Sequence, residues 1–332
     1  MSAPSRWIAG GVPAFQTGPR LRESVRSLLA QRLPEGTAWS GITVVVSGAS
    51  DDTLAVAQAL AREDPRVSVV HQPRREGKAS ALRAIFAEAR GDALVLLNGD
   101  ATARPGAVEA LLGAAPTPSG PFAVMGRPCP PAALTRGLGR GIEVLWELHH
   151  RVHRATLERE DGNHLSDELW LLPLPVPSPL PAGVVNDGAF VGAWLRENGG
   201  RLFYAPAALV EIEVPRTPAE HLRQRRRISW GNHQVRDLLG VHPTTWFGYA
   251  RGDPPGAVRL LVSTLRDYPR AVLSTFLLAA LELEAVLLAG WDRHVVVRDH
   301  VLWEIVAPDG ATSPLAAARR TGSERRAAPE GG

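Results

Sequence analysis

Short apolar runs alternate with amphipathic stretches through the first part of the chain. The apolar runs cover residues 7–12, 42–46, 67–70 and 93–97, and the amphipathic stretches cover residues 21–31, 53–62, 78–89 and 105–112. Four-residue to six-residue apolar runs predict buried strands, and apolar positions three or four residues apart predict helices. The alternation therefore predicts an α/β fold, with a mostly parallel, Rossmann-like sheet flanked by helices.

The second part of the chain has a different pattern. Apolar positions from residue 138 to residue 152 predict one long helix, and residues 171–183 carry a proline at every second place and predict an extended connector. Helices are predicted for residues 187–197 and 217–239, with a strand at 201–214 between them.

Ligands of parallel α/β sheets lie beyond the carboxyl ends of the strands. The residues directly after each predicted strand are therefore the first candidates for a binding site. They are residues 13–16, 47–52, 72–78 and 98–100.

Composition adds little to this picture. A formal charge of +3 with 21% charged residues does not demand a nucleic-acid partner. One cysteine excludes an intrachain disulfide framework, and the first residues hold no apolar run of signal-peptide length. We therefore expect a cytoplasmic protein.

Lys78 is the only lysine among the 37 lysines and arginines of the chain, and it stands in the stretch REGKASAL. A compact ammonium enters a narrow pocket that a planar guanidinium cannot enter. Gly77 before it suits a tight turn into a helix, whose N-terminus favours an anion such as phosphate. The alternative is chance in an arginine-rich composition.

Three further stretches carry candidate chemistry. Asp100 ends the apolar run LVLLNGD and is placed to hold a divalent cation, although an aspartate there is also a common turn former. Asp187 begins a predicted helix in VVNDGAF, where Asn186 or Asp187 could simply cap the helix. The run QRRRISW places arginines 225–227 on a helix, where three consecutive residues cannot share one face. At least one is expected to point inward toward an anion while the others are solvated, and the alternative is a fully solvated basic face.

The order of these stretches resembles the family 2 glycosyltransferases of the GT-A fold, over roughly residues 7–239. The resemblance implies an inverting transfer of a sugar from a nucleotide-sugar donor, most simply a UDP-sugar, to an acceptor hydroxyl, with Mn²⁺ or Mg²⁺ as cofactor. It implies that Asp187 is the catalytic base and Asp100 the metal ligand. It assigns nucleotide contacts to Pro13, Phe15, Gln16, Ser47, Asp51, Lys78 and Asn98. It assigns the diphosphate and acceptor entrance to Gln224, Arg227 and Trp230.

Several positions depart from the family pattern. Gln16, Val46, Ser47 and Asn98 stand where the family usually has carboxylates, and Ile228 stands in place of a tryptophan. These departures leave two alternatives open: a catalytically degenerate GT-A domain that serves as a nucleotide-binding or scaffold protein, and a nucleotidyltransferase on the same sheet.

The expected organisation is a GT-A domain at residues 1–240, divided at 126/127 into nucleotide-binding and acceptor halves, a helical extension at 241–310 and a disordered tail at 311–332. Residues 271–290 are about as long as a membrane span. Their apolar residues contribute about −5 kcal/mol to insertion, whereas Glu282 and Glu284 cost about 5 to 7 kcal/mol, so spanning is not favoured. A helix packed on protein is expected, with peripheral contact at the inner face of the cell membrane as the alternative.

Overall fold

The strand β4 (Ala93–Leu97) lies in the middle of the sheet, and all five of its residues are buried. The computed structural model describes residues 4–116, 120–131, 138–296 and 300. These residues fall within a unit bounded by Met1–Val301. The predicted tail at 311–332 lies outside the described residues.

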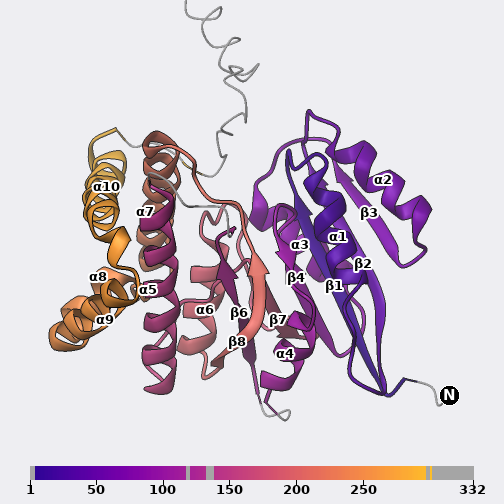
Figure 1. Cartoon of the computed structure of the whole chain (residues 1–332). Helices are drawn as coiled ribbons and strands as arrows, with labels where there is room; N and C mark the ends of the chain where they lie inside the picture. Colours follow the sequence, from indigo (N-terminus) through magenta and orange to yellow (C-terminus); the bar gives the residue numbers. More distant parts are fainter. Residues whose placement is uncertain (1–3, 117–119, 132–137, 297–299, 301–332) are drawn as a thin grey trace, which may run out of the picture. The chain divides into compact units, whose positions relative to one another are not determined.

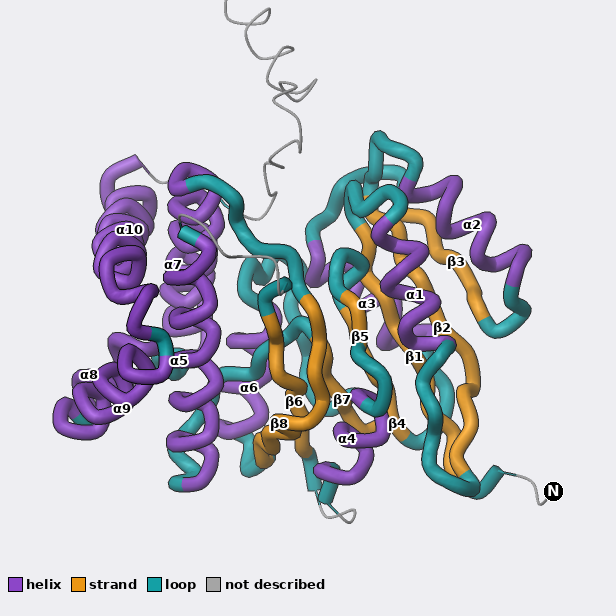
Figure 2. Tube along the Cα trace, viewed as in Figure 1, coloured by secondary structure: helices purple, strands orange, loops and turns teal. Residues whose placement is uncertain are grey.

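The sheet has the strand order β3-β2-β1-β4-β7-β6-β8-β5 (Figure 2). The strands besides β4 are β1 (Arg6–Ala14), β2 (Thr37–Ser47), β3 (Val67–Gln72), β5 (Thr102–Ala103), β6 (Phe122–Cys129), β7 (Leu169–Pro173) and β8 (Arg201–Glu211). The first helices are α1 (Arg20–Leu29), α2 (Thr53–Glu63), α3 (Lys78–Glu88) and α4 (Ala107–Ala114). The later helices are α5 (Gly139–Glu158), α6 (Asp187–Glu197), α7 (Pro218–Leu239), α8 (Trp246–Gly252), α9 (Pro254–Asp267) and α10 (Val272–Trp291).

The direction of β7 determines which residues meet at the edge of the sheet. The strands β3, β2, β1 and β4 are parallel, whereas β7 is antiparallel to both β4 and β6. Leu97, the last residue of β4, pairs with Leu169, the first residue of β7. The segment before β7 therefore lies at the same edge as the carboxyl ends of β1, β2 and β4, and the α/β fold class is confirmed as a mixed rather than an all-parallel sheet.

Two hydrophobic layers cover the two faces of the sheet. One layer packs α1, α2, α4 and the first half of α5 on the sheet, and the other packs α3 and α6. Small residues bring α3 close to β1: a side chain on Gly11 would lie 2.4 Å from a methyl of Ile85. Helix α3, which begins with Lys78, is thereby held directly against the strand that ends in the predicted nucleotide turn.

Most predicted elements are present within one to five residues of their expected ends. The strand β6 was not expected, and the proline-rich connector begins inside β7, since its residues 171–173 are paired and mostly buried. Proline is tolerated there because Pro173 is the last residue of the strand. The extension predicted at 241–310 contains α8, α9 and α10, which lie beside α5 and α7 (Figure 1).

Helix α10 is joined to α7 by two ion-pair clusters. Arg225 donates to Glu282 at 2.8 Å, and His221 lies 2.8 Å from the same carboxylate. Arg226 forms an ion pair with Asp292. The expectation that the outer arginines of the run 225–227 are solvated is therefore wrong for both, because α10 covers that side of α7.

The two glutamates of α10 face different surroundings. Glu282 is 8% exposed, whereas Glu284 is exposed on the opposite side. Burial alone would raise the pKa of Glu282, but Arg225 and His221 outweigh it and lower that pKa. Glu282 is thus ionised and held within the protein.

We predict that Glu282→Ala lowers the free energy of unfolding by about 3 kcal/mol, because it leaves the buried His221 and the partly exposed guanidinium of Arg225 without their shared carboxylate. Glu284→Ala is the matched control and should change it by about 0.5 kcal/mol at most. The folded-state pKa of Glu282 is depressed, so the stabilisation is present above the ordinary pKa of 4.5 and is lost as the pH falls through the lowered value. Urea denaturation at neutral and acidic pH measures both effects; equal losses in the two variants would contradict the ion-pair assignment.

Candidate active site

The turns after β1 and β3 pack against each other at the carboxyl edge of the sheet. The guanidinium of Arg75 lies over the ring of Phe15, 4.1 Å from its centroid. Gln16 has a positive φ of 49°, and its amide donates a hydrogen bond to Ser50 at 2.5 Å. Left-handed backbone at a non-glycine residue is uncommon and often marks a functional turn.

The turn after β2 completes this group. The Ser47 hydroxyl accepts a hydrogen bond from the backbone N–H of Glu76 at 3.3 Å. Gly48 has a φ of 61°, and a side chain there would lie 2.3 Å from the backbone nitrogen of Arg75. Asp51 is exposed, and its carboxylate accepts from the N–H of Thr53 at the start of α2. The predicted nucleotide residues of β1 and β2 therefore do lie together.

The end of β4 is fixed by backbone hydrogen bonds. Gly99 donates to the carbonyl of Pro13 at 3.1 Å, and Asn98 donates to the carbonyl of Glu168 at 3.1 Å. Asp100 is solvent-exposed, although the protein around it raises the pKa of its carboxyl above the ordinary value. An accessible carboxylate at the end of a strand is well placed to bind a cation.

Three charged side chains meet beside this strand end. Gly77 has a φ of 88° and turns the chain into α3, which begins with Lys78. The Lys78 ammonium contacts Asp167 and lies 3.1 Å from Oδ2 of Asp187. Lys78 and Asp167 are about a quarter exposed, whereas Asp187 is 2% exposed. Lys78 thus pairs with carboxylates in this structure.

The electrostatics of this cluster separate its two aspartates. Burial, together with repulsion from Asp167, raises the pKa of Asp187 to about 7, and Lys78 opposes the rise. For Asp167 burial also raises the pKa, but the attraction of Lys78 outweighs it and the pKa is lowered. Glu168 behaves like Asp187, because burial and, to a lesser extent, repulsion from Asp167 raise its pKa to about 7. Two acids of unlike pKa are the usual basis for assigning separate roles.

The start of α6 holds Asp187 in place without using it as a cap. The side chain of Asn186 is the N-cap and accepts from the N–H of Ala189 at 3.1 Å, so Asp187 is the first residue of the helix. The helix approaches the segment before β7 closely, because a side chain on Gly188 would lie 2.7 Å from Cβ of Asp167. The capping interpretation therefore applies to Asn186, and Asp187 is left for another role.

Helix α7 supports the loop before Asp187. Gln234 accepts from the N–H of Val185 and donates to the carbonyl of Gly183, each at 2.9 Å. Gly231 abuts Asn186, with room for no side chain between them. One face of α7 is therefore directed at the start of α6.

Arg227 lies on the same face of α7, since it precedes Gly231 by four residues. Burial lowers the pKa of Arg227, and the carboxylates of Asp187 and Asp167 oppose this shift. The innermost arginine of the run is thus the one that approaches the acid cluster. This agrees with the expectation that one arginine points inward.

The other two residues predicted on α7 lie before and after Arg227. Gln224 is half-buried one turn earlier. The indole of Trp230 lies 5.5 Å from the ring of His300, between centroids. The structure therefore brings Arg227 to the acid cluster and directs Trp230 toward the end of the helical extension.

Asp167 and Glu168 were missed by the sequence reasoning. They precede an apolar run, in the stretch SDELWLL, and only residues after a run were considered. Because β7 runs antiparallel to β4, its first residues lie at the carboxyl edge of its neighbours. An acidic pair before an apolar run is the signal, but it is informative only once the strand direction is known.

Comparisons with known proteins agree with this architecture. The model of the family described as glycosyl transferase family 2 matches residues 11–137. The structure of a mannosyltransferase from Pyrobaculum calidifontis in complex with GDP-Man and Mn²⁺ has a TM-score of 0.62 at 17% identity and covers 90% of each chain. Glucosyl-3-phosphoglycerate synthase from Mycobacterium tuberculosis, in complex with Mn²⁺, UDP and glucosyl-3-phosphoglycerate, has a TM-score of 0.47 at 20% identity over 72% of this chain and 82% of that chain. No curated protein matches the sequence.

We predict that Asp167→Asn lowers the pKa of Asp187 from about 7, because it removes a repelling charge and leaves Lys78 to Asp187 alone. Carbon-13 NMR titration of the aspartate carboxyls, with Asp187→Asn to assign the signal, measures this pKa. Asp161→Asn, an exposed site before the same segment, is the control. An Asp187 pKa that is unchanged in Asp167→Asn would contradict the coupling.

Proposed function

The chain belongs to the family 2 glycosyltransferases over residues 11–137 and has the GT-A fold, and from this premise we propose that it transfers a sugar from a nucleotide-sugar donor to an acceptor hydroxyl with inversion. Asp187 is the proposed general base. The observation that carries the proposal is its buried carboxylate, with a pKa raised to about 7, beside Lys78 at the carboxyl edge of the sheet. A base with a pKa near the working pH is the most effective one.

The donor nucleotide is proposed to occupy the turns after β1 and β2. Phe15 and Ser47 are already fixed there by contacts with the segment before Lys78. The diphosphate would lie near the N-terminus of α3, where backbone N–H groups and the Lys78 ammonium favour an anion. A UDP-sugar remains the proposed donor, and a GDP-sugar is the alternative because the mannosyltransferase of the same fold binds GDP-Man.

The residues at the end of β4 fit a divalent cation. Asp100 would supply an accessible carboxylate, and Asn98, two residues earlier, would offer an amide oxygen. No three His, Cys, Asp or Glu side chains of the described residues form a complete metal site. This suits Mn²⁺ or Mg²⁺, which take one or two protein carboxylates together with substrate phosphates. When bound, the ion supplies stabilisation for the charge that develops on the leaving nucleotide.

The proton transfer follows from the position of Lys78. In this structure its ammonium lies against Oδ2 of Asp187. A donor diphosphate competes for that ammonium, and its withdrawal would leave Oδ2 free to take the proton of the acceptor hydroxyl. Arg227 supplies a second positive charge near Asp187 and Asp167. Attack from the face away from the nucleotide inverts the anomeric carbon.

A second candidate function is a nucleotide-binding or scaffold protein without turnover. The observation that favours it is Gln16, whose neutral amide stands where the family usually has a carboxylate and is bonded to Ser50. Asn98 is likewise neutral. Retention of Asp100 and Asp187 with the single lysine favours the enzyme.

We predict that Asp187→Asn lowers sugar transfer, or slow donor hydrolysis, by about 10² to 10⁴. Nucleotide affinity should be retained or increased, because Asp187 no longer competes with the diphosphate for Lys78. In the wild type, kcat/KM should fall as the pH drops below about 7, because kcat/KM reports the free enzyme, in which Asp187 must be ionised to accept a proton. Activity is measured over a donor and acceptor panel, and affinity by melting shifts with UDP and GDP, each with and without Mn²⁺. Asp161→Asn is the control. If Asp187→Asn turns over as fast as the wild type, Asp187 is not the catalytic base. If the wild type binds nucleotide but shows no turnover, the scaffold function is favoured.

We also propose that the helical extension contacts an anionic membrane surface. In the described part of the chain, Pro269–Val296 is long and apolar enough to cross a membrane, with a mean hydropathy of 2.0 and 22% of its most apolar window buried. Its buried side carries Glu282, so the expected cost of that charge in lipid does not apply. Large apolar side chains are exposed on its outer side: Leu273, Phe276, Leu277, Leu283, Leu287 and Trp291.

Arginines accompany this apolar surface. Four of them are exposed and form no ion pair among the described residues: Arg251, Arg259, Arg266 and Arg270. An exposed apolar patch next to unpaired cations is typical of a surface that binds anionic lipid. Contact through the outer side of α10 would leave its ion pairs with α7 in place.

We predict that the wild-type chain sediments with vesicles of phosphatidylcholine and phosphatidylglycerol more than with phosphatidylcholine alone. Replacing both Arg266 and Arg270 by glutamine should weaken this binding by roughly 30-fold, from about 1 kcal/mol for each charge. Arg62→Gln on α2, far from the extension in sequence and exposed, is the control. Equal binding by both variants, or burial of the patch in a concentration-dependent dimer, would contradict the lipid assignment.

A further inference from the structure

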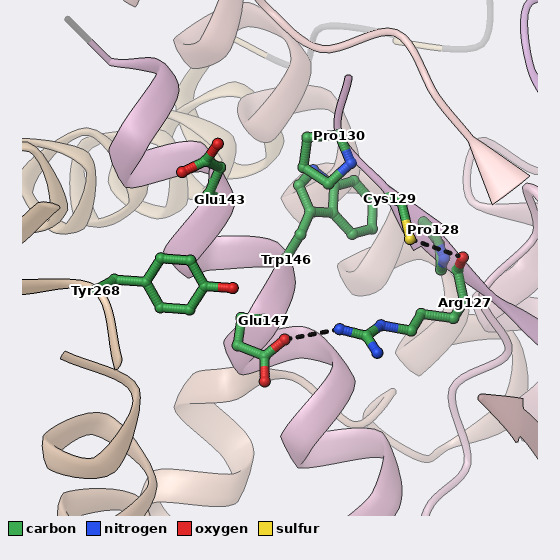
Figure 3. Close-up of a pocket in the computed structure, with 8 residues that line it drawn as sticks. All are labelled: Arg127, Pro128, Cys129, Pro130, Glu143, Trp146, Glu147 and Tyr268. Carbon is green, nitrogen blue, oxygen red and sulfur yellow. Dashed lines mark hydrogen bonds and ion pairs between the residues drawn. The ribbon is translucent and has the colours of Figure 1, made fainter. Parts of the chain in front are cut away.

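A pocket of about 220 Å³ lies between the end of β6, the first half of α5 and the turn after α9 (Figure 3). Its walls are Arg127, Pro128, Cys129, Pro130, Glu143, Trp146, Glu147 and Tyr268. The proposed donor and metal sites use none of these residues. At about 30 Å³ for each water, the space holds roughly seven waters, which suits one small ring rather than a nucleotide.

One wall of the pocket is rigid. Glu147 accepts hydrogen bonds from Arg127 and Arg151, each at 2.8 Å. Arg151 also donates to Ser263 at 2.8 Å and to Asp267 at 2.5 Å, which ties α5 to α9. The pocket is therefore held open by ion pairs between elements that are far apart in sequence.

The other wall carries unused hydrogen-bonding groups. Neither the carboxylate of Glu143 nor the hydroxyl of Tyr268 has a hydrogen-bond partner within the described residues, and both residues line the pocket. The Tyr268 hydroxyl points toward Trp146 and Glu147 (Figure 3). Burial raises the pKa of Glu143, and Arg140 opposes the rise. The indole of Trp146 lines the same pocket and lies next to Pro130 (Figure 3). A half-buried carboxylate without a partner is stabilised by a ligand that donates hydrogen bonds.

The pocket lies at the same edge of the sheet as the acid cluster. The strand β6 is antiparallel to β7, which is antiparallel to β4, so β6 and β4 end at the same edge. Two strand spacings, or about 10 Å, separate β6 from β4 across the sheet, and β6 runs about three residues, or roughly 10 Å, beyond the level at which β4 ends. Asp167, at the start of β7, lies between them in the strand order.

We propose that this pocket binds a neutral, hydroxyl-bearing ring of the acceptor, a saccharide unit. The proposal rests on the proposed sugar transfer. Hydroxyl groups donate to Glu143 and accept from the partly exposed guanidinium of Arg127, while the apolar face of a sugar ring packs on Trp146. Glu143 and Glu147 disfavour a phosphate or carboxylate ligand, which separates this pocket from the donor site.

The test uses methyl α-mannopyranoside and methyl β-glucopyranoside as probes, with binding to the full chain followed by ligand-observed NMR. Glu143→Ala should weaken binding of the better probe at least about tenfold, because a charged acceptor of hydrogen bonds is lost. Tyr268→Phe keeps the packing and should weaken it about two- to fivefold. Glu158→Ala, an exposed glutamate on the same helix, should change nothing.

The shifts in melting temperature that UDP and GDP cause are measured on the same variants, and they separate this proposal from the proposed function. Weaker glycoside binding with unchanged nucleotide binding supports the pocket, whether or not the wild type turns over. Equal glycoside binding by wild type, Glu143→Ala and Tyr268→Phe overturns it, even if sugar transfer is found. Absence of glycoside binding by the wild type, with nucleotide binding intact, also overturns it.

Discussion

One ammonium between two carboxylates is the interaction on which the candidate site depends. Asp187 is only 2% exposed, and an isolated charge at that depth would be costly enough to keep the carboxyl protonated. Lys78 offsets part of that cost but is shared with Asp167, so the pKa of Asp187 stays near 7 rather than returning to its ordinary value. The same contact that permits Asp187 to be buried therefore sets its proton affinity. Any anion that draws Lys78 away changes that affinity.

This contact requires three segments that are distant in the chain. Lys78 begins α3, Asp187 begins α6, and Asp167 reaches the site only because β7 runs antiparallel to β4. Gly188 lets α6 approach the segment that carries Asp167, and α7 holds the preceding loop through Gln234. The ion pairs of α7 with α10 lie on the other side of the same helix. The helical extension thus supports the helix that supports the site.

The alternation of apolar runs and helices was sufficient to predict the first half of the fold. Runs such as ALVLL are buried on both faces, so composition alone marks them as strands. The second half was harder because β7 is short, ends in prolines and runs against its neighbours. Asp167 was missed for that reason. A helix packed on protein was expected at residues 271–290, but the pairing of Glu282 with Arg225 was missed because long-range ion pairs leave no periodic signal.

The single lysine acquires a physical explanation that differs from the one its sequence suggests. If position 78 only had to bind a phosphate, an arginine would serve as well, since guanidinium binds phosphate readily. Contact with two carboxylates from different segments, the loop before β7 and the start of α6, calls for a small cation whose donors can point in several directions. A guanidinium would instead engage one carboxylate in a planar pair. Arg226 shows the planar pair in this molecule, with two of its nitrogens on the carboxylate of Asp292. At position 78 such a pair would hold one acid and leave the other buried without compensation.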